Sequence, residues 1–182
     1  PDIAKPMNIR FDNRGRLFVT HSLEYPYPAA DDAAKRDAVT RMEDFDEQGR
    51  ATTITKVVEG LNIPIGLLPV DDAVIYHTIP QINISRDTDG DGEYDEEELL
   101  YGTIESRDTH GMCNSLNRWL DGWIYACHGF ANNSTVQGSD GQAITMNSGN
   151  TWRMKLDGSH CEYWTHGQVN PFGMSWDPLG NL

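Results

Sequence analysis

Residues 9–19 read Ile9-Arg-Phe-Asp-Asn-Arg-Gly15-Arg-Leu-Phe-Val19, two short apolar runs separated by a tight polar turn. Glycine at the end of such a turn supplies the positive φ that a short hairpin often requires. The stretch therefore predicts a β-hairpin, and its importance grows because it recurs along the chain.

Three further copies follow, at Leu67–Tyr76, Leu116–Tyr125 and Met174–Leu182. With Gly15, Asp72, Gly122 and Gly180 taken as equivalent, the intervals are 57, 50 and 58 residues. Gly or Asp at this point is expected to provide the positive φ of each turn. A period of this length indicates a repeat architecture.

A second hairpin lies between successive copies of the first. Its three versions span residues 41–60, 81–102 and 152–164. Two hairpins in each repeat make a four-stranded antiparallel sheet, which is the composition of a β-propeller blade. A β-sandwich, the other all-β arrangement considered, would show turn signals without this long period. The predicted fold class is thus all-β, a β-propeller.

The repeats divide the chain into one partial propeller domain, residues 1–182, with blades at about 5–60, 61–104 and 105–168. Residues 169–182 begin the next blade. Because propellers close with roughly 4–8 blades, we expect the remaining blades to lie outside this chain. Expressed alone, it should aggregate through its open sheet edges. Two polar segments, His21–Ala38 and Asn132–Asn150, are expected to be long loops of the kind that carry binding surfaces.

The net charge of −14, from 14 basic and 28 acidic side chains, repels phosphate backbones and anionic membranes. Nucleic acid is therefore excluded as an expected partner. No apolar run reaches the length of roughly 18 residues that a membrane helix needs. The acidity itself fits either solubility or cation binding.

One segment favours cation binding, Asp87-Thr-Asp-Gly-Asp-Gly-Glu-Tyr-Asp-Glu-Glu-Glu98. Its acidic side chains stand at positions 1, 3, 5, 9 and 12 of the loop, with glycine at 6, as in an EF-hand. The predicted calcium ligands are Asp87, Asp89, Asp91, Glu93 (through its carbonyl), Asp95 and Glu98. Ca²⁺ takes 6–8 hard oxygens, and short Asp side chains in a tight turn converge on one point.

The stretch before this loop contains Pro80 and β-branched residues, so the entering helix of an EF-hand is missing. We therefore expect a calcium-type loop that connects two strands of a blade. The alternative is a solvated acidic turn without metal.

Three cysteines, Cys113, Cys127 and Cys161, form no CxxC or Cys/His metal spacing. Cys113 and Cys127 flank one predicted hairpin, so a disulfide between them is conceivable. Three buried thiols are the alternative that an odd count favours.

His110 precedes the third copy of the first hairpin, and Asn170 precedes the fourth. In a propeller, segments that enter an innermost strand lie near the central channel, where ligands bind. A histidine there could serve as a general base. A hydrogen-bonded structural histidine remains the other interpretation.

Several motifs together resemble the membrane-bound dehydrogenase domain proteins, a branch of the quinoprotein glucose/sorbosone dehydrogenase-like superfamily. They are residues 10–19, 87–92, 108–116, 121–125 and 170–173. The resemblance implies a six-bladed, secreted or periplasmic propeller that acts as a pyrroloquinoline quinone-type dehydrogenase on a sugar or other alcohol. It also implies cytochrome c segments that carry haem outside this chain.

In those enzymes, a histidine at the place of His110 takes the hydroxyl proton, and an asparagine at the place of Asn170 helps to hold the quinone. An arginine precedes that asparagine, whereas this chain has Val169. Losing a cation that faces an anionic quinone argues against quinone binding. Two hypotheses remain: an oxidoreductase domain with His110 as base, and a non-catalytic propeller that binds carbohydrate or another protein domain.

Overall fold

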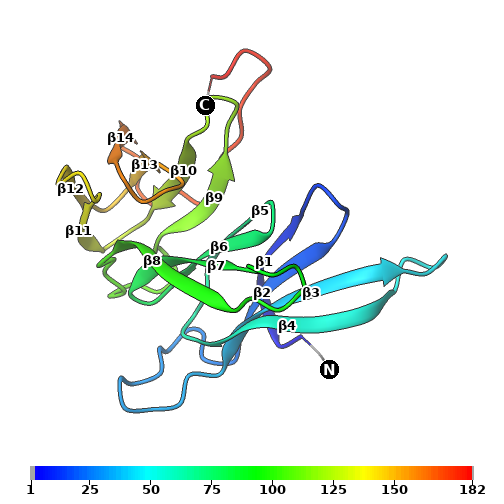
Figure 1. The fold of residues 1–182 in the computed structure, drawn as a ribbon. Helices are drawn as coiled ribbons and strands as arrows, with labels where there is room; N and C mark the ends of the chain where they lie inside the picture. Colours follow the sequence, from blue (N-terminus) through cyan, green and yellow to red (C-terminus); the bar gives the residue numbers. More distant parts are fainter. Residues whose placement is uncertain (1–2, 182) are drawn as a thin grey trace. The chain divides into compact units, whose positions relative to one another are not determined.

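The computed structural model describes residues 3–181, and every regular element in that range is a β-strand (Figure 1). The chain divides into two compact units, Pro1–Leu99 and Leu100–Leu182. Within residues 3–181, no helix is long and apolar enough to cross a membrane. The predicted all-β class of four-stranded antiparallel sheets is confirmed.

The first sheet runs in chain order, with each strand antiparallel to the next. Its strands are β1 (Lys5–Phe11), β2 (Leu17–Ser22), β3 (Asp37–Phe45) and β4 (Ala51–Leu61). Pairing of β2 with β3 stops at Leu17 and Met42, whereas β3 and β4 pair as far as Phe45 and Ala51. The β3–β4 hairpin therefore projects beyond its sheet as a two-stranded arm (Figure 1).

The second sheet also runs in chain order. Its strands are β5 (Gly66–Val70), β6 (Ala73–Thr78), β7 (Gln81–Arg86) and β8 (Glu96–Gly102). The core of the first unit joins both sheets, since Phe18 and Val39 of the first belong to one buried cluster with Leu67 and Tyr76 of the second. Burial of these apolar faces is what holds two such sheets together.

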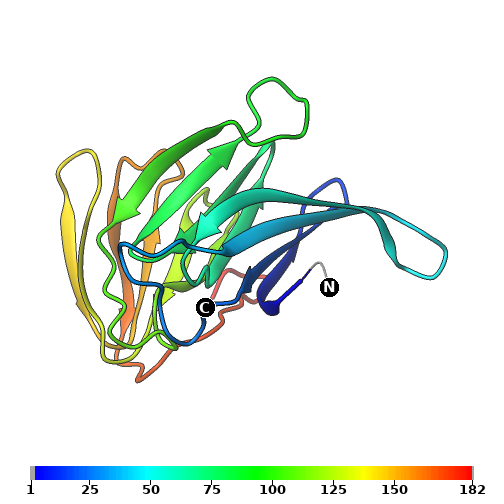
Figure 2. The ribbon, with the colours of Figure 1, turned by 90° about the horizontal axis from the view of Figure 1, so that it is seen from below.

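The third sheet has the order β14-β13-β10-β9. Its strands are β9 (Asn114–Arg118), β10 (Ile124–His128), β13 (Asn150–Met154) and β14 (Cys161–His166). A separate hairpin of β11 (Asn133–Gln137) and β12 (Ala143–Asn147) stands between β10 and β13 in the chain and lies beside β14 (Figure 2).

This inserted hairpin corrects the prediction of a loop over Asn132–Asn150. Its strands alternate between exposed and buried residues, and Ser134, Val136, Ile144 and Met146 all point inward. Such alternation is the strand signal, hidden here because most of the outward positions are Thr, Gln and Asn. The other predicted loop is found over residues 23–36, while His21, Ser22, Asp37 and Ala38 belong to strands.

The repeated turns share one geometry. Asp12 N–H donates to Arg16 O (3.0 Å), and Gly15 N–H donates back to Asp12 O (3.2 Å), with Gly15 at φ 79°. The same pair of bonds closes the turns that end at Gly122 and Gly180. This is a type I turn followed by a left-handed glycine, which explains the recurring Gly.

The second copy differs from the prediction, because the positive φ of 49° belongs to Asp71 rather than to Asp72. Only Asp71 and Asp72 separate β5 from β6, so this turn is shorter than the others. In the fourth copy the turn forms, residues 171–181 contain no strand, and Leu182 lies outside the described residues.

Each four-stranded sheet also carries a buried histidine near the end of its second strand in chain order. His21, His77 and His128 are 5%, 0% and 0% exposed. Burial lowers the pKa of His21 and of His128, because a charged imidazole is poorly solvated there. The three cysteines are buried free thiols, so no disulfide joins Cys113 and Cys127.

Candidate functional site

The acidic loop between β7 and β8 brings three carboxylates together. Asp87, Asp89 and Asp91 each offer an oxygen atom within 4.8 Å of the other two. Backbone amides fix the side chain of Asp87, whose two oxygens accept from Gly90 N–H (2.7 Å) and Gly92 N–H (2.9 Å). Three like charges at this separation repel one another, and a cation among them would relieve that repulsion.

The loop is anchored to the first sheet of the same unit. Arg41 Nη1 donates to Gly92 O (3.0 Å), and Tyr94 packs against the buried apolar cluster. Burial raises the pKa of the Tyr94 hydroxyl, so it stays neutral at any physiological pH. A loop tied down at two points has less freedom to lose when it binds an ion.

The other predicted ligands are placed differently. Asp95 accepts from the hydroxyl of Thr88 (2.7 Å) and from its N–H (3.1 Å), and the first of these bonds chiefly lowers the pKa of Asp95. Glu93 donates its backbone N–H to Asp91 (2.8 Å). Glu98 accepts from Arg86 Nη1 (2.9 Å).

The position of Glu98 follows from strand geometry. An EF-hand loop continues into a helix, whereas β8 begins here at Glu96. Successive side chains of a strand point to opposite faces. Glu96 and Glu98 therefore face Arg86 together, while Glu97 accepts from Tyr76 on the other face. The structure thus groups the three aspartates, and Asp95 and Glu98 have other partners.

His110 lies on an exposed turn of the second unit and is paired with Asp108. Its Nδ1 is 3.0 Å from Asp108 Oδ1, which also accepts the backbone N–H of His110 (3.0 Å). The imidazole side chain is 63% exposed. With the Nδ1 proton held by the carboxylate, Nε2 is the basic nitrogen.

Asn170 meets the same turn. Its Oδ1 accepts from Phe130 N–H (2.9 Å), and a Cβ on Gly111 or Gly129 would lie only 2.8 or 2.5 Å from that oxygen. Both positions need glycine for this close approach. Asn170 therefore lies directly beside Gly111, the residue that follows His110.

A buried asparagine is bonded to the backbone of this turn. The side chain of Asn132 accepts from Asp108 N–H (3.0 Å) and donates to Asp108 O (2.9 Å), so it holds the backbone of Asp108 in place. In a second set of buried contacts, the imidazole of His128 lies 2.8 Å from Ser134 Oγ and 3.0 Å from Ser148 O. None of these supporting residues was singled out from the sequence, since their role depends on contacts between distant segments.

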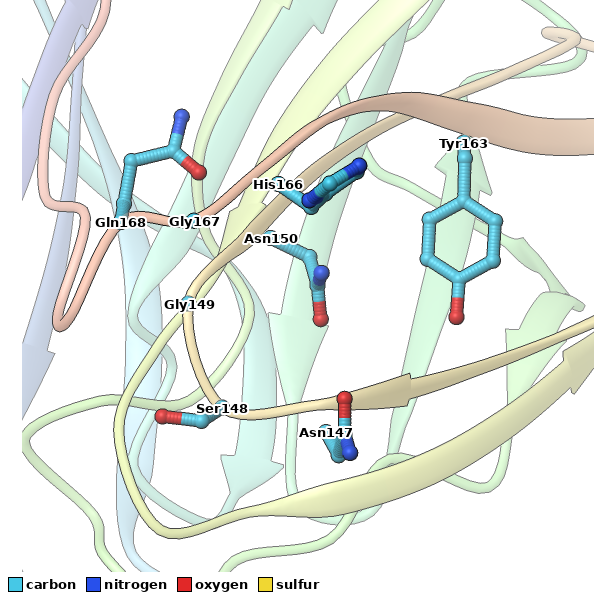
Figure 3. A pocket seen from close by; sticks show the side chains of 8 residues that line it. All are labelled: Asn147, Ser148, Gly149, Asn150, Tyr163, His166, Gly167 and Gln168. Carbon is cyan, nitrogen blue, oxygen red and sulfur yellow. The ribbon is translucent and has the colours of Figure 1, made fainter.

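A cavity of about 420 Å³ opens beside the turn between β12 and β13 (Figure 3). We call it the turn pocket. It is lined by Asn147, Ser148, Gly149, Asn150, Tyr163, His166, Gly167 and Gln168. The side chains of Asn147, Asn150 and Tyr163 border one common space in Figure 3. Sequence reasoning missed this pocket because it assigned residues 132–150 to a loop.

The successive four-stranded sheets define a protein of the β-propeller class, here a partial propeller. A gluconolactonase from Xanthomonas campestris has this fold in common, with a TM-score of 0.51 at 18% identity, over 80% of this chain and 48% of that chain. Regucalcin, a calcium-binding protein from Agrobacterium tumefaciens, gives a TM-score of 0.49 at 13% identity, over 79% and 45%. The chain spans about half the length of these solved structures.

Residues 1–182 match the family described as Domain of unknown function (DUF7133), and the chain belongs to that family. A comparison with curated proteins finds no match. The resemblance to quinoprotein dehydrogenases therefore stays a prediction.

Proposed function

We propose that this chain is part of a propeller that acts on a sugar or another small alcohol, with His110 as the general base. The observation that carries the proposal is the exposed His110–Asp108 pair beside Asn170. An imidazole oriented by a carboxylate and open to solvent is suited to accept a hydroxyl proton. The gluconolactonase, which shares the fold, is consistent with a sugar-related role.

In this proposal, this chain supplies the base, and the hydride acceptor lies outside this chain. His110 would accept the hydroxyl proton, and Asn170 would help to position the turn. Oxidation of the alcohol also needs a hydride acceptor, which the proposal places outside this chain. Val169, an exposed apolar residue, stands where the resemblance places an arginine, so these residues do not fit an anionic quinone.

We further propose that Asp87, Asp89 and Asp91 bind Ca²⁺ as a structural ion. Three carboxylates, loop carbonyls such as that of Glu93 and water would supply its oxygens, and Asp95 or Glu98 would need to leave their present partners to join.

The catalytic proposal is tested with the full-length protein, a panel of sugars and alcohols, and an artificial electron acceptor. His110→Ala should lower turnover by about 10²–10⁴-fold, the usual cost of losing a general base.

A matched control is His160→Ala, because His160 likewise pairs with a carboxylate, Asp140 (2.6 Å), at another turn of the same unit. It should keep its turnover. Equal turnover in His110→Ala and the unmodified protein would leave His110 with a structural role.

The second candidate function is a non-catalytic propeller that binds carbohydrate. The turn pocket favours it, because its neutral polar lining could hold a ligand without any proton transfer. Saturable sugar binding without turnover under any acceptor would support this candidate over the first.

A further inference from the structure

The turn at residues 108–111, on which His110 is exposed, has a buried anchor at its first residue. The side chain of Asn132 makes two hydrogen bonds to the backbone of Asp108 and is itself fully buried. Asn132 is held in turn, because its backbone oxygen accepts from Ser148 N–H (2.9 Å). A buried amide whose donor and acceptor are both paired resists displacement, since any movement leaves a polar group unpaired.

Asp108 passes this constraint to the imidazole. Its Oδ1 lies 3.0 Å from the backbone nitrogen of His110 and 3.0 Å from the ring Nδ1. A carboxylate can only accept hydrogen bonds, so Nδ1 carries the proton, and the bond sets the direction of the ring. An imidazole without such a partner at Nδ1 would populate both neutral tautomers. Movement of the Asp108 backbone would therefore change both the direction and the tautomer of His110.

The first unit contains the same kind of contact without a histidine bonded to it. Asn62, which is also buried, accepts from Ala29 N–H (3.0 Å) and donates to Ala29 O (3.1 Å). That pair holds the loop of residues 23–36, whereas Asn132 holds the residue that orients an imidazole. The two asparagines therefore separate the structural effect of such a contact from its effect on His110.

We propose that Asn132 is a positioning residue for the imidazole of His110 and acts through Asp108. By fixing the backbone of Asp108, it keeps the Nδ1 proton on the carboxylate, so that Nε2 is the nitrogen that accepts a proton. Because Asn132 is buried, it acts without touching the substrate. The inference rests on the proposed function, in which His110 is the base, and adds the residue that prepares this base.

The first test needs no substrate. Nuclear magnetic resonance of the full-length protein with isotopically labelled histidine reports the tautomer at alkaline pH, where an ordinary imidazole is neutral. His110→Ala identifies the signals of His110. The unmodified protein should show the Nδ1-protonated tautomer, Asn132→Ala should show a mixture of tautomers, and Asn62→Ala should match the unmodified protein. Unaltered His110 signals in Asn132→Ala would overturn the proposal.

The second test is turnover with the panel of sugars and alcohols. Asn132→Ala should lower turnover by about 10–100-fold, less than the loss in His110→Ala, because misplacing a catalytic group by about 1 Å can cost about 100-fold. Asn62→Ala should keep its turnover. If His110→Ala loses turnover and Asn132→Ala keeps it, the positioning proposal is wrong.

The two tests also separate this inference from the proposed catalysis. If Asn132→Ala changes the tautomer while His110→Ala keeps its turnover, the catalytic proposal is wrong and the positioning of His110 stands. If no member of the panel is turned over, the tautomer alone decides.

Stability is compared in parallel, because Asn132→Ala and Asn62→Ala each remove two buried hydrogen bonds. Their melting temperatures should fall to a similar extent, so that a change confined to His110 in one of them is not a general loss of folding. If Asn132→Ala does not fold, hydrogen exchange of the unmodified protein replaces it. The Asp108 amide should then exchange slowly, since its bond to Asn132 must open first. Rapid exchange, or an imidazole of His110 protonated at Nε2, would overturn the proposal.

Discussion

The acidic loop and the turn pocket are two polar sites of opposite design. In the acidic loop, three carboxylates converge at the surface, and their backbone bonds hold them close in spite of their repulsion. Beside the turn pocket, the amide of Asn150 is buried among uncharged side chains, and its Oδ1 accepts no hydrogen bond within the described residues. One site has excess charge, and the other lacks a hydrogen-bond donor.

This difference shows that two kinds of unsatisfied polar group call for different compensation. A cluster of like charges is stabilised by an ion, whose main contribution is electrostatic. An unpaired buried acceptor is stabilised by a hydrogen-bond donor, whose contribution is a directed hydrogen bond. The predictions below test the charges of the acidic loop and, beside the turn pocket, the buried His128.

The largest expected effect is the removal of calcium from the acidic loop. Calcium at about 100 times its dissociation constant should stabilise the full-length protein by about 2.7 kcal/mol, because the ion binds only the folded loop. Thermal melting with calcium and with chelator measures this difference. Asp87→Asn should abolish it, whereas Asp157→Asn, an exposed acid in the β13–β14 turn, should retain it. Equal midpoints with and without calcium would leave a solvated acidic turn.

A smaller effect distinguishes the three-aspartate site from an EF-hand arrangement. Because Asp91 belongs to the cluster and Glu98 is paired with Arg86, Asp91→Asn should weaken calcium binding by about tenfold, or about 1.4 kcal/mol. Glu98→Gln should weaken it less. Calcium titration of both variants checks the order, and the reverse order would mean that Glu98 joins the ion.

A further effect is a loss of stability in acid, which we attribute in part to His128 beside the turn pocket. The pKa of His128 is lowered by burial, so the unfolded chain takes up a proton near pH 6.5, before the folded chain does. The contribution of neutral His128 to the free energy of unfolding is therefore complete above that pH. It decreases below that pH, by at most about 1.4 kcal/mol per pH unit. Denaturant unfolding at pH 7.5 and 5.5 measures the loss. His128→Gln should reduce it and leave the part due to His21, whose pKa burial also lowers. An unchanged loss in His128→Gln would assign the effect elsewhere.

The smallest effect concerns the Arg86–Glu98 ion pair. Both side chains are partly exposed, so Arg86→Gln should change stability by less than about 1 kcal/mol. The variant should nevertheless bind calcium more tightly, because it removes a nearby positive charge and frees Glu98. Weaker binding in Arg86→Gln would show that the pair positions the loop rather than competing with the ion.

The sequence predicts those features that depend on short segments. The turns ending at Gly15 and Gly122 are found as expected, because a left-handed glycine fixes a hairpin locally. Convergence of Asp87, Asp89 and Asp91 likewise follows from spacing within one loop. The position of Glu98 does not, since it depends on β8 beginning at Glu96.

The turn pocket could not be predicted for a related reason. The burial of Asn150 depends on how residues 147–149 pack against residues 166–168. No sequence pattern marks these two segments as neighbours. The β11–β12 hairpin within residues 132–150 has only four alternating buried positions, and the polar residues between them concealed that period. Polar strands carry a weak hydrophobic period, so tertiary contacts decide them.

The inserted β11–β12 hairpin also affects the order in which the sheets can assemble. In the second sheet, β6 and β7 are joined by residues 79–80 alone, so their pairing needs almost no loop closure. In the third sheet, β10 must find β13 across residues 129–149. Loop-closure entropy grows by about 0.6 kcal/mol for each doubling of length, and non-local pairing slows folding. The inserted hairpin shortens that search by folding on itself, and the third sheet should still be the last to close.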